Sequence, residues 1–203
     1  HKMDRLAPRF ISSIHSLVRS GYDCDYISDN FIRTLTISNG QLRTEGGAQY
    51  KALIIPGAKL MPHDILDKLL KLAKKGANIV FLDQYPTDVP GYNDLAARRK
   101  TFAKTIAQLK ECSMTSLSTV NAAPEEMKTK YGLSAIRRKN ATGYHYFISS
   151  LQEKGVSDWV SLSVHADAIA LFNPMDGSVK KALTREKDGK TQVYLHLASG
   201  ESC

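Results

Sequence analysis

The chain has 203 residues, enough for one large domain or two small ones, and its basic side chains outnumber its acidic ones by 28 to 20. The resulting charge of +8 is spread along the chain, and its basic clusters suit solvated helix faces, so we expect no nucleic-acid partner. No apolar run approaches the roughly 18 residues that a membrane-spanning helix needs, so we expect no membrane span. The three cysteines form no CxxC pair, which argues against a disulfide framework or a zinc site.

The chain begins with a helical pattern. Apolar residues recur at helical spacing over residues 6–18, and Gly21 follows as a C-terminal stop. Residues 22–27 then alternate between aromatic or apolar and acidic or small side chains, which predicts a strand with Asp23 and Asp25 on one face. Paired carboxylates can do acid–base chemistry, but no third polar partner is evident nearby, so we prefer a wet face of an edge strand.

A single βαβ unit organises the first part of the chain. Residues 52–55 and 78–82 are short apolar runs of the kind that form strands buried on both faces. Between them, apolar residues recur at helical spacing, with Pro62 near the start and Gly76 just past the end. A crossover of this kind needs further strands and helices to cover the sheet.

We expect residues 1–132 to form an α/β domain, a flavodoxin-like or amidotransferase-like parallel sheet with helices on both faces. A hairpin turn at residues 38–40, a long helix over 93–110, a short strand at 116–120 and a short helix at 124–131 belong to it.

From residue 133 the hydrophobic period changes to two. Six short strand-like runs follow, separated by turn sequences such as NATG, PMDG and KDG. Residues 133–203 are therefore expected to form an antiparallel β domain, an incomplete sandwich. Its aromatic residues could present a platform for stacking sugars, but we prefer core positions for Phe147 and Trp159. The other aromatic residues considered for that platform are Tyr144 and Tyr146.

The ends of the two predicted parallel strands carry the candidate ligand-binding residues. Gly57 follows the first strand, and Asp83, Gln84 and Tyr85 follow the second. Open α/β sheets bind ligands outside the carboxyl ends of their strands, so these four residues are the expected lining of a cleft. Asp83 is the best single candidate for a catalytic acid or base, although an Asp at a strand end more often accepts hydrogen bonds from loop amides.

We predict no catalytic residue, metal or cofactor in this chain. The turn after the first strand reads PGAKLMP and has no Ser or Cys where hydrolases and class I glutamine amidotransferases place their nucleophile. No phosphate-binding glycine motif and no metal-binding histidine spacing occurs. Glycoside hydrolysis needs two placed carboxylates, and the sequence does not supply their separation. The carboxylates to consider are Asp23, Asp25, Asp83, Asp88, Glu125 and Glu126.

Several segments together resemble the carboxyl-terminal region of the α-L-rhamnosidase-type enzymes of glycoside hydrolase family 106. They are GYDCDYISD, YKALIIPGAKLMP, KKGANIVFLDQYPTDVPG, IRRKNATGYHYFISS and IALFNPMDGSV, and the similarity runs from about Gly21 to Ser199. The resemblance implies an amidotransferase-like domain followed by the opening of a β-sandwich. It also implies a large secreted or periplasmic bacterial enzyme that cuts plant-type polysaccharide, with its catalytic carboxylates in a separate, preceding barrel domain.

The resulting hypothesis is a noncatalytic accessory and structural region of a glycoside hydrolase. Its expected partner is the catalytic barrel of the same parent chain or a neighbouring subunit, with carbohydrate as a further candidate. The alternatives are a free-standing flavodoxin-like enzyme for a small ligand and a carbohydrate-binding module. Because the chain opens with His1, we expect a processed form or a fragment.

Overall fold

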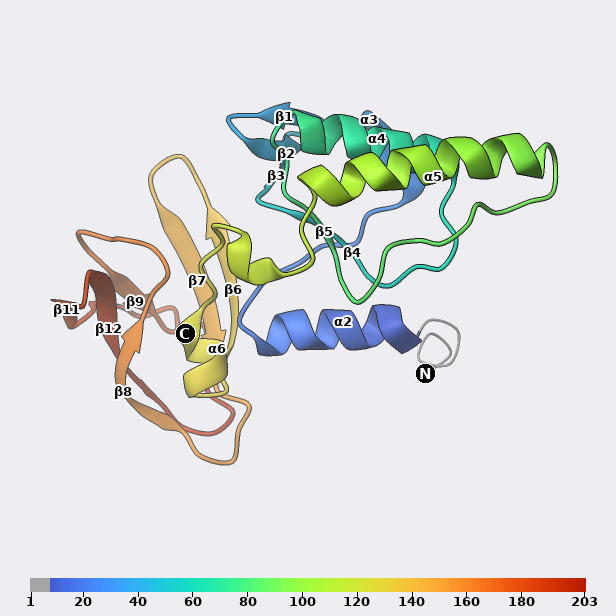
Figure 1. Ribbon diagram of the computed structural model, residues 1–203. Helices are drawn as coiled ribbons and strands as arrows, with labels where there is room; N and C mark the ends of the chain where they lie inside the picture. The colour runs from blue at the N-terminus through green and yellow to red at the C-terminus, as the bar shows by residue number, and fades with distance from the viewer. Residues whose placement is uncertain (1–7) are drawn as a thin grey trace. The chain divides into compact units, whose positions relative to one another are not determined.

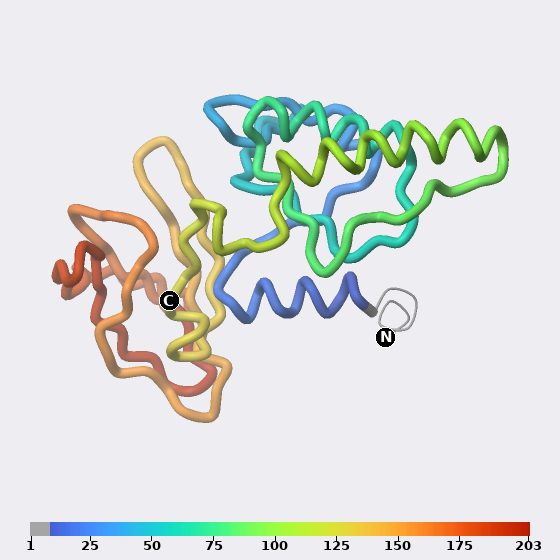
Figure 2. Tube along the Cα trace, in the orientation of Figure 1, coloured from blue at the N-terminus to red at the C-terminus, as the bar shows by residue number. Residues whose placement is uncertain are grey.

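The computed structural model describes residues 8–203, which form two compact units (Figure 1). Unit 1 takes in the described residues up to Ile14 and residues 25–122, and unit 2 takes in residues 15–24 and 123–203. Figure 2 follows the chain as it leaves unit 1, passes through residues 15–24 and returns. The division into domains at residues 132 and 133 stays a prediction. Part of the expected first helix, residues 6 and 7, lies outside the described residues.

Short strands and two long helices make up unit 1. The helix α2 (Pro8–Arg19) begins the described chain, passes from unit 1 to unit 2 after Ile14 and ends before Gly21. The elements that follow are α3 (Asp29–Thr34), β1 (Thr36–Ser38), β2 (Gln41–Arg43), β3 (Gln49–Tyr50), β4 (Leu53–Ile55), α4 (His63–Lys74), β5 (Ile79–Phe81), α5 (Leu95–Cys112) and the short 3₁₀ helix η1 (Leu117–Thr119).

The βαβ unit predicted from the sequence is present. β4 and β5 pair in parallel, with Leu53 opposite Ile79 and Ile55 opposite Phe81. The crossover helix α4 buries Leu66 and Leu69 completely in the core of unit 1. Burial of each such side chain stabilises the fold by roughly 1.5–3 kcal/mol. Because the buried face of the helix contributes this much, its apolar spacing was enough to predict the helix from the sequence.

The parallel sheet is narrower than expected. Among the described residues it has two strands, and a wider flavodoxin-like sheet is not confirmed. Met114 extends the pairing by one residue, since the Phe81 amide donates to its carbonyl at 2.9 Å and its own amide donates to Ile79 at 2.9 Å. The prediction of a strand at residues 116–120 is wrong. The strand-like pairing occurs at Met114, two residues before the expected start, and η1 follows it.

The strand expected over residues 22–27 is also wrong. This segment is irregular, and its side chains find partners without a neighbouring strand. Asp25 Oδ2 accepts a hydrogen bond from the Tyr50 hydroxyl at 2.7 Å, and the Tyr26 ring lies 5.7 Å from the Phe10 ring. By contrast, the predicted hairpin turn is confirmed. β1 and β2 pair antiparallel, and the two turn residues both have positive φ, as a type I′ turn requires.

Antiparallel strands dominate unit 2, as the period of two predicts. The hairpin β6–β7 and the sheet β11-β12-β8 share one core, in which Ala135 and Ile148 meet Val160 and Leu195. A full β-sandwich stays a prediction. The elements are α6 (Glu126–Lys130), β6 (Ser134–Lys139), β7 (Tyr144–Ser149), β8 (Val156–Ser161), β9 (Ala170–Phe172), β10 (Val179–Lys181), β11 (Thr184–Lys187) and β12 (Lys190–Leu197).

The preferred core positions of two aromatic residues need correction. Phe147 is 52% exposed, opposite Ile136 on the outer face of the β6–β7 hairpin. Trp159 is half-buried and lies on the face of β8 opposite to the buried Val160. Its ring packs edge-on against Tyr194 at 5.5 Å and carries the Arg185 guanidinium 4.3 Å from its centroid. Alternation along a strand places neighbours on opposite faces, so Trp159 and Val160 cannot both face the core.

Candidate functional site

An open cleft of about 480 Å³ lies at the carboxyl ends of β4 and β5 in unit 1. Gly57, just after β4, and Gln84, just after β5, both line it, as the sequence predicts for the strand-end cleft. Three further residues complete the lining, namely Arg9, Lys59 and Thr87. Parallel strands end at the same edge of a sheet, so loops separated by some 27 positions meet there.

Two backbone connections hold the cleft loops together. The Thr87 amide donates to the Lys59 carbonyl at 2.9 Å, and the Met61 amide donates to the Asp88 carbonyl at 3.1 Å. The Asp88 carboxylate is in turn held by Arg99, whose Nε lies 2.9 Å from Oδ1. This guanidinium lowers the pKa of Asp88 to about 2. The loops are therefore fixed to the first turns of α5.

Asp83 lies beside the cleft without being part of its lining. A Cβ built on Gly57 would be 3.5 Å from Asp83 Cβ and 3.6 Å from its Oδ2, so the carboxylate faces this glycine. Asp83 has a φ of 67°, a conformation that costs a non-glycine residue about 1–3 kcal/mol and recurs at functional sites. Ligand binding by Gly57, Asp83 and Gln84 stays a prediction.

Tyr85, the fourth predicted residue, is engaged elsewhere. Its ring packs 4.6 Å from the Phe81 ring, and its hydroxyl lies 2.9 Å from Ser113 Oγ at the end of α5. Lys110 stands over the same ring at 5.6 Å. These contacts pack Tyr85 against the core of unit 1, and it is not among the residues that line the cleft. Ligand binding by Tyr85 stays a prediction.

Sequence reasoning missed the cations of the cleft. Arg9 and Lys59 are exposed, and within residues 8–203 neither side chain has a carboxylate oxygen in ion-pair range. Lys59 lies in the predicted turn after the first strand, so the sequence could have identified it as a cleft residue. Arg9 comes from α2, and no local signal connects it with Gly57. The cleft presents positive charge and an amide, which suits a polar or acidic ligand more than acid–base chemistry.

Most carboxylates considered for catalysis are held by partners. Asp23 forms an ion pair with Lys128, and Glu126 forms one with Lys190. Lys190 thereby lowers the pKa of Glu126. Asp25 accepts from Tyr50, as described above. A catalytic acid needs a raised pKa, so Glu126 is poorly suited to that role.

Glu125 is the most buried of them, with 3% of its surface exposed. Its Oε1 accepts from Arg137 Nη1 at 2.6 Å and from the Tyr146 hydroxyl at 2.9 Å, and its Oε2 accepts from the Ser163 amide at 3.2 Å. The Ser163 hydroxyl also donates to Oε1. Burial raises the pKa of Tyr146 to about 12, and Glu125 adds to that rise. The cluster ties α6 to β6, β7 and the segment after β8.

Two further properties of the described region bear on function. Between Pro8 and Cys203 no helix is long and apolar enough to cross a membrane. Over the same residues, no group of three or more His, Cys, Asp or Glu side chains is placed to hold a metal ion.

Comparisons with known proteins give consistent matches. A protein of Formosa agariphila named "Putative beta-glucuronidase" is 25% identical over 194 residues, which is 90% of this chain and 16% of that protein. The solved structure of a rhamnosidase from Novosphingobium sp. PP1Y superposes with a TM-score of 0.71 at 20% identity, over 88% of this chain and 19% of that one. The second match shows a shared fold. The chain thus spans less than a fifth of the length of either protein.

A family model provides the assignment. The model of the α-L-rhamnosidases, glycoside hydrolase family 106, matches residues 6–185 and so includes residues of both units. This chain therefore belongs to glycoside hydrolase family 106, the α-L-rhamnosidase family.

Proposed function

We propose that this chain is a noncatalytic accessory and structural region of a larger rhamnosidase-type glycoside hydrolase. In this proposal, unit 1 is an amidotransferase-like domain that has lost its nucleophile, and the antiparallel strands belong to a β-sandwich. The catalytic carboxylates lie in a barrel domain of the parent chain, which is also the main partner. The parent enzyme is secreted or periplasmic and acts on polysaccharide.

One observation carries the proposal. Glycoside hydrolysis requires two carboxyl groups about 5–10 Å apart that flank one sugar bond. Among the described residues, the strand-end cleft is lined by no carboxylate, and Glu126 is the one carboxylate that lines the pocket of unit 2. Glu126 is ion-paired with Lys190, so its pKa is shifted away from that of a general acid.

The small share of the relatives that the chain covers supports the same conclusion. So does the turn around Gly57, where Ala58 and Lys59 stand in place of a nucleophile. The names of the two relatives refer to a glucuronidase and a rhamnosidase, and we take a saccharide of this kind to be the substrate of the parent enzyme.

The test is turnover by the chain alone. We expect the purified 203-residue chain to release no nitrophenol from 4-nitrophenyl α-L-rhamnoside or 4-nitrophenyl β-D-glucuronide above the rate in buffer. A characterised rhamnosidase assayed in parallel confirms that the conditions support the reaction. Turnover that disappears when Glu126 or Asp83 is replaced by the amide would contradict the proposal.

A further inference from the structure

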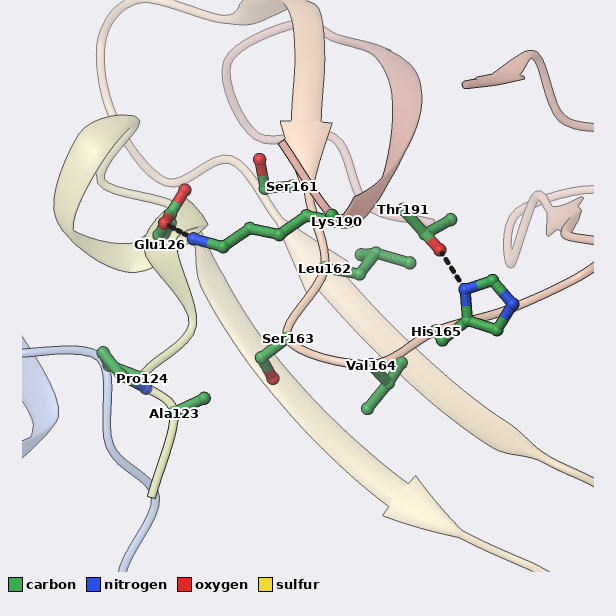
Figure 3. A pocket seen from close by; sticks show the side chains of 11 residues that line it. Ala123, Pro124, Glu126, Ser161, Leu162, Ser163, Val164, His165, Lys190 and Thr191 are labelled. Atoms are coloured by element: carbon green, nitrogen blue, oxygen red, sulfur yellow. Dashed lines mark hydrogen bonds and ion pairs between the residues drawn. The ribbon is translucent and has the colours of Figure 1, made fainter. Parts of the chain in front are cut away.

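The pocket of unit 2 is a small hollow of about 200 Å³ between α6, β12 and the segment that follows β8 (Figure 3). It is smaller than the roughly 300–1,000 Å³ pockets that hold drug-sized ligands. All of its lining comes from residues 123, 124, 126, 161–165 and 189–191, which belong to one compact unit. Three separate chain segments therefore converge on a space that suits one small ring.

The charges at this pocket cancel. Figure 3 shows the Lys190 side chain reaching from β12 toward Glu126 on α6, where the two form an ion pair. Their side chains remain 48% and 45% exposed, so each keeps hydrogen-bonding capacity for a third group. The Lys190 ammonium has three donors and the Glu126 carboxylate has several acceptor sites. A charged ligand would find one attractive and one repulsive group, whereas a neutral ligand can use both.

The rest of the lining alternates polar and apolar groups. Ser161, Ser163 and Thr191 also line the pocket, but the Ser163 and Thr191 hydroxyls already donate to Glu125 and Glu186. The neutral polar side chains left to meet a ligand are the half-buried Ser161 and the exposed His165, whose Nδ1 is 3.4 Å from Thr191 Oγ1. The half-buried Val164 and the exposed Pro124 supply apolar surface, whereas Leu162 is buried in the core of unit 2. A ligand with both C–H and O–H faces matches this mixture, because its apolar face covers the aliphatic side chains while its hydroxyls meet the polar groups.

We propose that this pocket binds one neutral sugar ring, with two adjacent hydroxyls that donate to Glu126 and accept from Lys190. The pocket itself calls for a small neutral polyol. The choice of a sugar rests on the proposed function, since the substrate of the parent enzyme is a saccharide. The site holds an end or a branch of the polysaccharide chain without cutting it, because one carboxylate lines it and glycoside hydrolysis requires two.

The experiment uses the 203-residue chain and L-rhamnose as the probe, with binding followed by saturation-transfer difference NMR. Ala123→Trp fills the pocket from an exposed position, and Ala141→Trp adds the same side chain at an exposed turn outside the lining. We expect binding to be abolished by Ala123→Trp and unchanged by Ala141→Trp. Far-UV circular dichroism and melting confirm that both variants are folded.

A second pair of variants tests the chemistry. Glu126→Gln removes a charged acceptor and is expected to weaken L-rhamnose binding about tenfold, the size of one charge-assisted hydrogen bond. Asp64→Asn breaks another exposed ion pair, with Arg33 in unit 1, and should leave binding unchanged. D-glucuronate should bind more weakly than L-rhamnose because its carboxylate meets Glu126.

Three results would overturn the assignment: no binding of L-rhamnose by the unmodified chain, equal binding by Ala123→Trp and Ala141→Trp, or tighter binding of D-glucuronate than of L-rhamnose. Turnover of the aryl rhamnoside would defeat the proposed function and leave the pocket to be judged by the Ala123→Trp result alone.

Discussion

At the scale of single residues, the chain separates charges that hold structure from charges that face solvent. Glu125 and Glu126 are neighbours in sequence, yet the first is buried among Arg137, Tyr146 and Ser163 while the second forms an exposed pair with Lys190. A carboxylate without water depends on its protein partners for every hydrogen bond. The two glutamates should therefore respond very differently to the same substitution.

We expect Glu125→Ala to destabilise unit 2 by an amount at or just below the roughly 3–5 kcal/mol that follows the removal of one partner from a buried ion pair. The Arg137 side chain keeps 31% of its surface exposed, which moderates the cost. Glu126→Ala is the matched control and should cost about 0–1 kcal/mol, as exposed pairs do. Urea unfolding followed by Trp159 fluorescence measures both. If both variants lost the same free energy of unfolding, the buried Glu125 would contribute no more to stability than the exposed Glu126.

The ion pair of Asp88 with Arg99 makes a prediction about pH. Because the folded-state pKa of Asp88 is about 2, below the ordinary value of 3.8, its stabilising effect is present above pH 3.8 and is lost as the pH falls through 2. We expect Asp88→Asn to unfold at a lower urea concentration than the unmodified chain at pH 6, with the difference shrinking below pH 3.8. Arg99→Gln should behave in the same way. A difference independent of pH would contradict this interpretation.

At the scale of elements, backbone geometry decides where helices end and segments cross. Gly21 ends the turn after α2 with a φ of 91°, and a Cβ at this position would lie 2.8 Å from the carbonyl oxygen of Glu125. The Glu125 amide donates to the Gly21 carbonyl at 3.0 Å, so the two backbones are in direct contact. Gly21, which the sequence marks as the end of a helix, thus also allows two chain segments to cross in direct contact.

Gly21→Ala is expected to destabilise unit 2 for two reasons. The left-handed conformation costs an L-residue roughly 1–2 kcal/mol, and the forced contact adds about 1–3 kcal/mol. Gly177 also has a positive φ, 71°, with nothing within 4 Å of an added Cβ, so Gly177→Ala should show the first cost alone. The comparison uses the Trp159 unfolding transition of each variant. Equal costs would mean that the backbones can separate without loss.

At the scale of the whole molecule, residues 8–203 form two hydrophobic cores with no buried residue in common. The core of unit 1 surrounds α4 and β5, and the core of unit 2 lies between the β6–β7 hairpin and the β11-β12-β8 sheet. The single tryptophan, Trp159, belongs to unit 2, whereas the helices α4 and α5 belong to unit 1. Trp159 fluorescence therefore reports on unit 2, and helical circular dichroism reports mainly on unit 1.

We expect a core substitution in one unit to lower the stability of that unit alone. Leu66→Ala, at a position with no exposed surface, should destabilise unit 1 by about 2–5 kcal/mol and shift the helical transition to lower urea. The Trp159 transition should remain where it is. Val160→Ala is the converse variant in unit 2 and should move the Trp159 transition. If Leu66→Ala moved both transitions equally, the chain would unfold as one cooperative body.

The sequence by itself determined the elements whose signals are local. Helical spacing between two apolar runs located the βαβ unit, Asn39-Gly40 located a hairpin, and the change of period after residue 132 located the antiparallel strands. These signals are carried by residues within a turn or two of one another, so no long-range contact is needed to find them. The same reasoning placed Gly57 and Gln84 at one sheet edge.

Only the tertiary structure decided which distant side chains meet. It showed that residues 22–27 have no neighbouring strand, that Tyr85 packs into the core, and that Arg9 reaches the cleft. It also joined Glu126 to Lys190, 64 positions later in the chain. Such meetings depend on how strands pair and pack. A local pattern records which face of an element a residue occupies, and the identity of its partner is set by the fold.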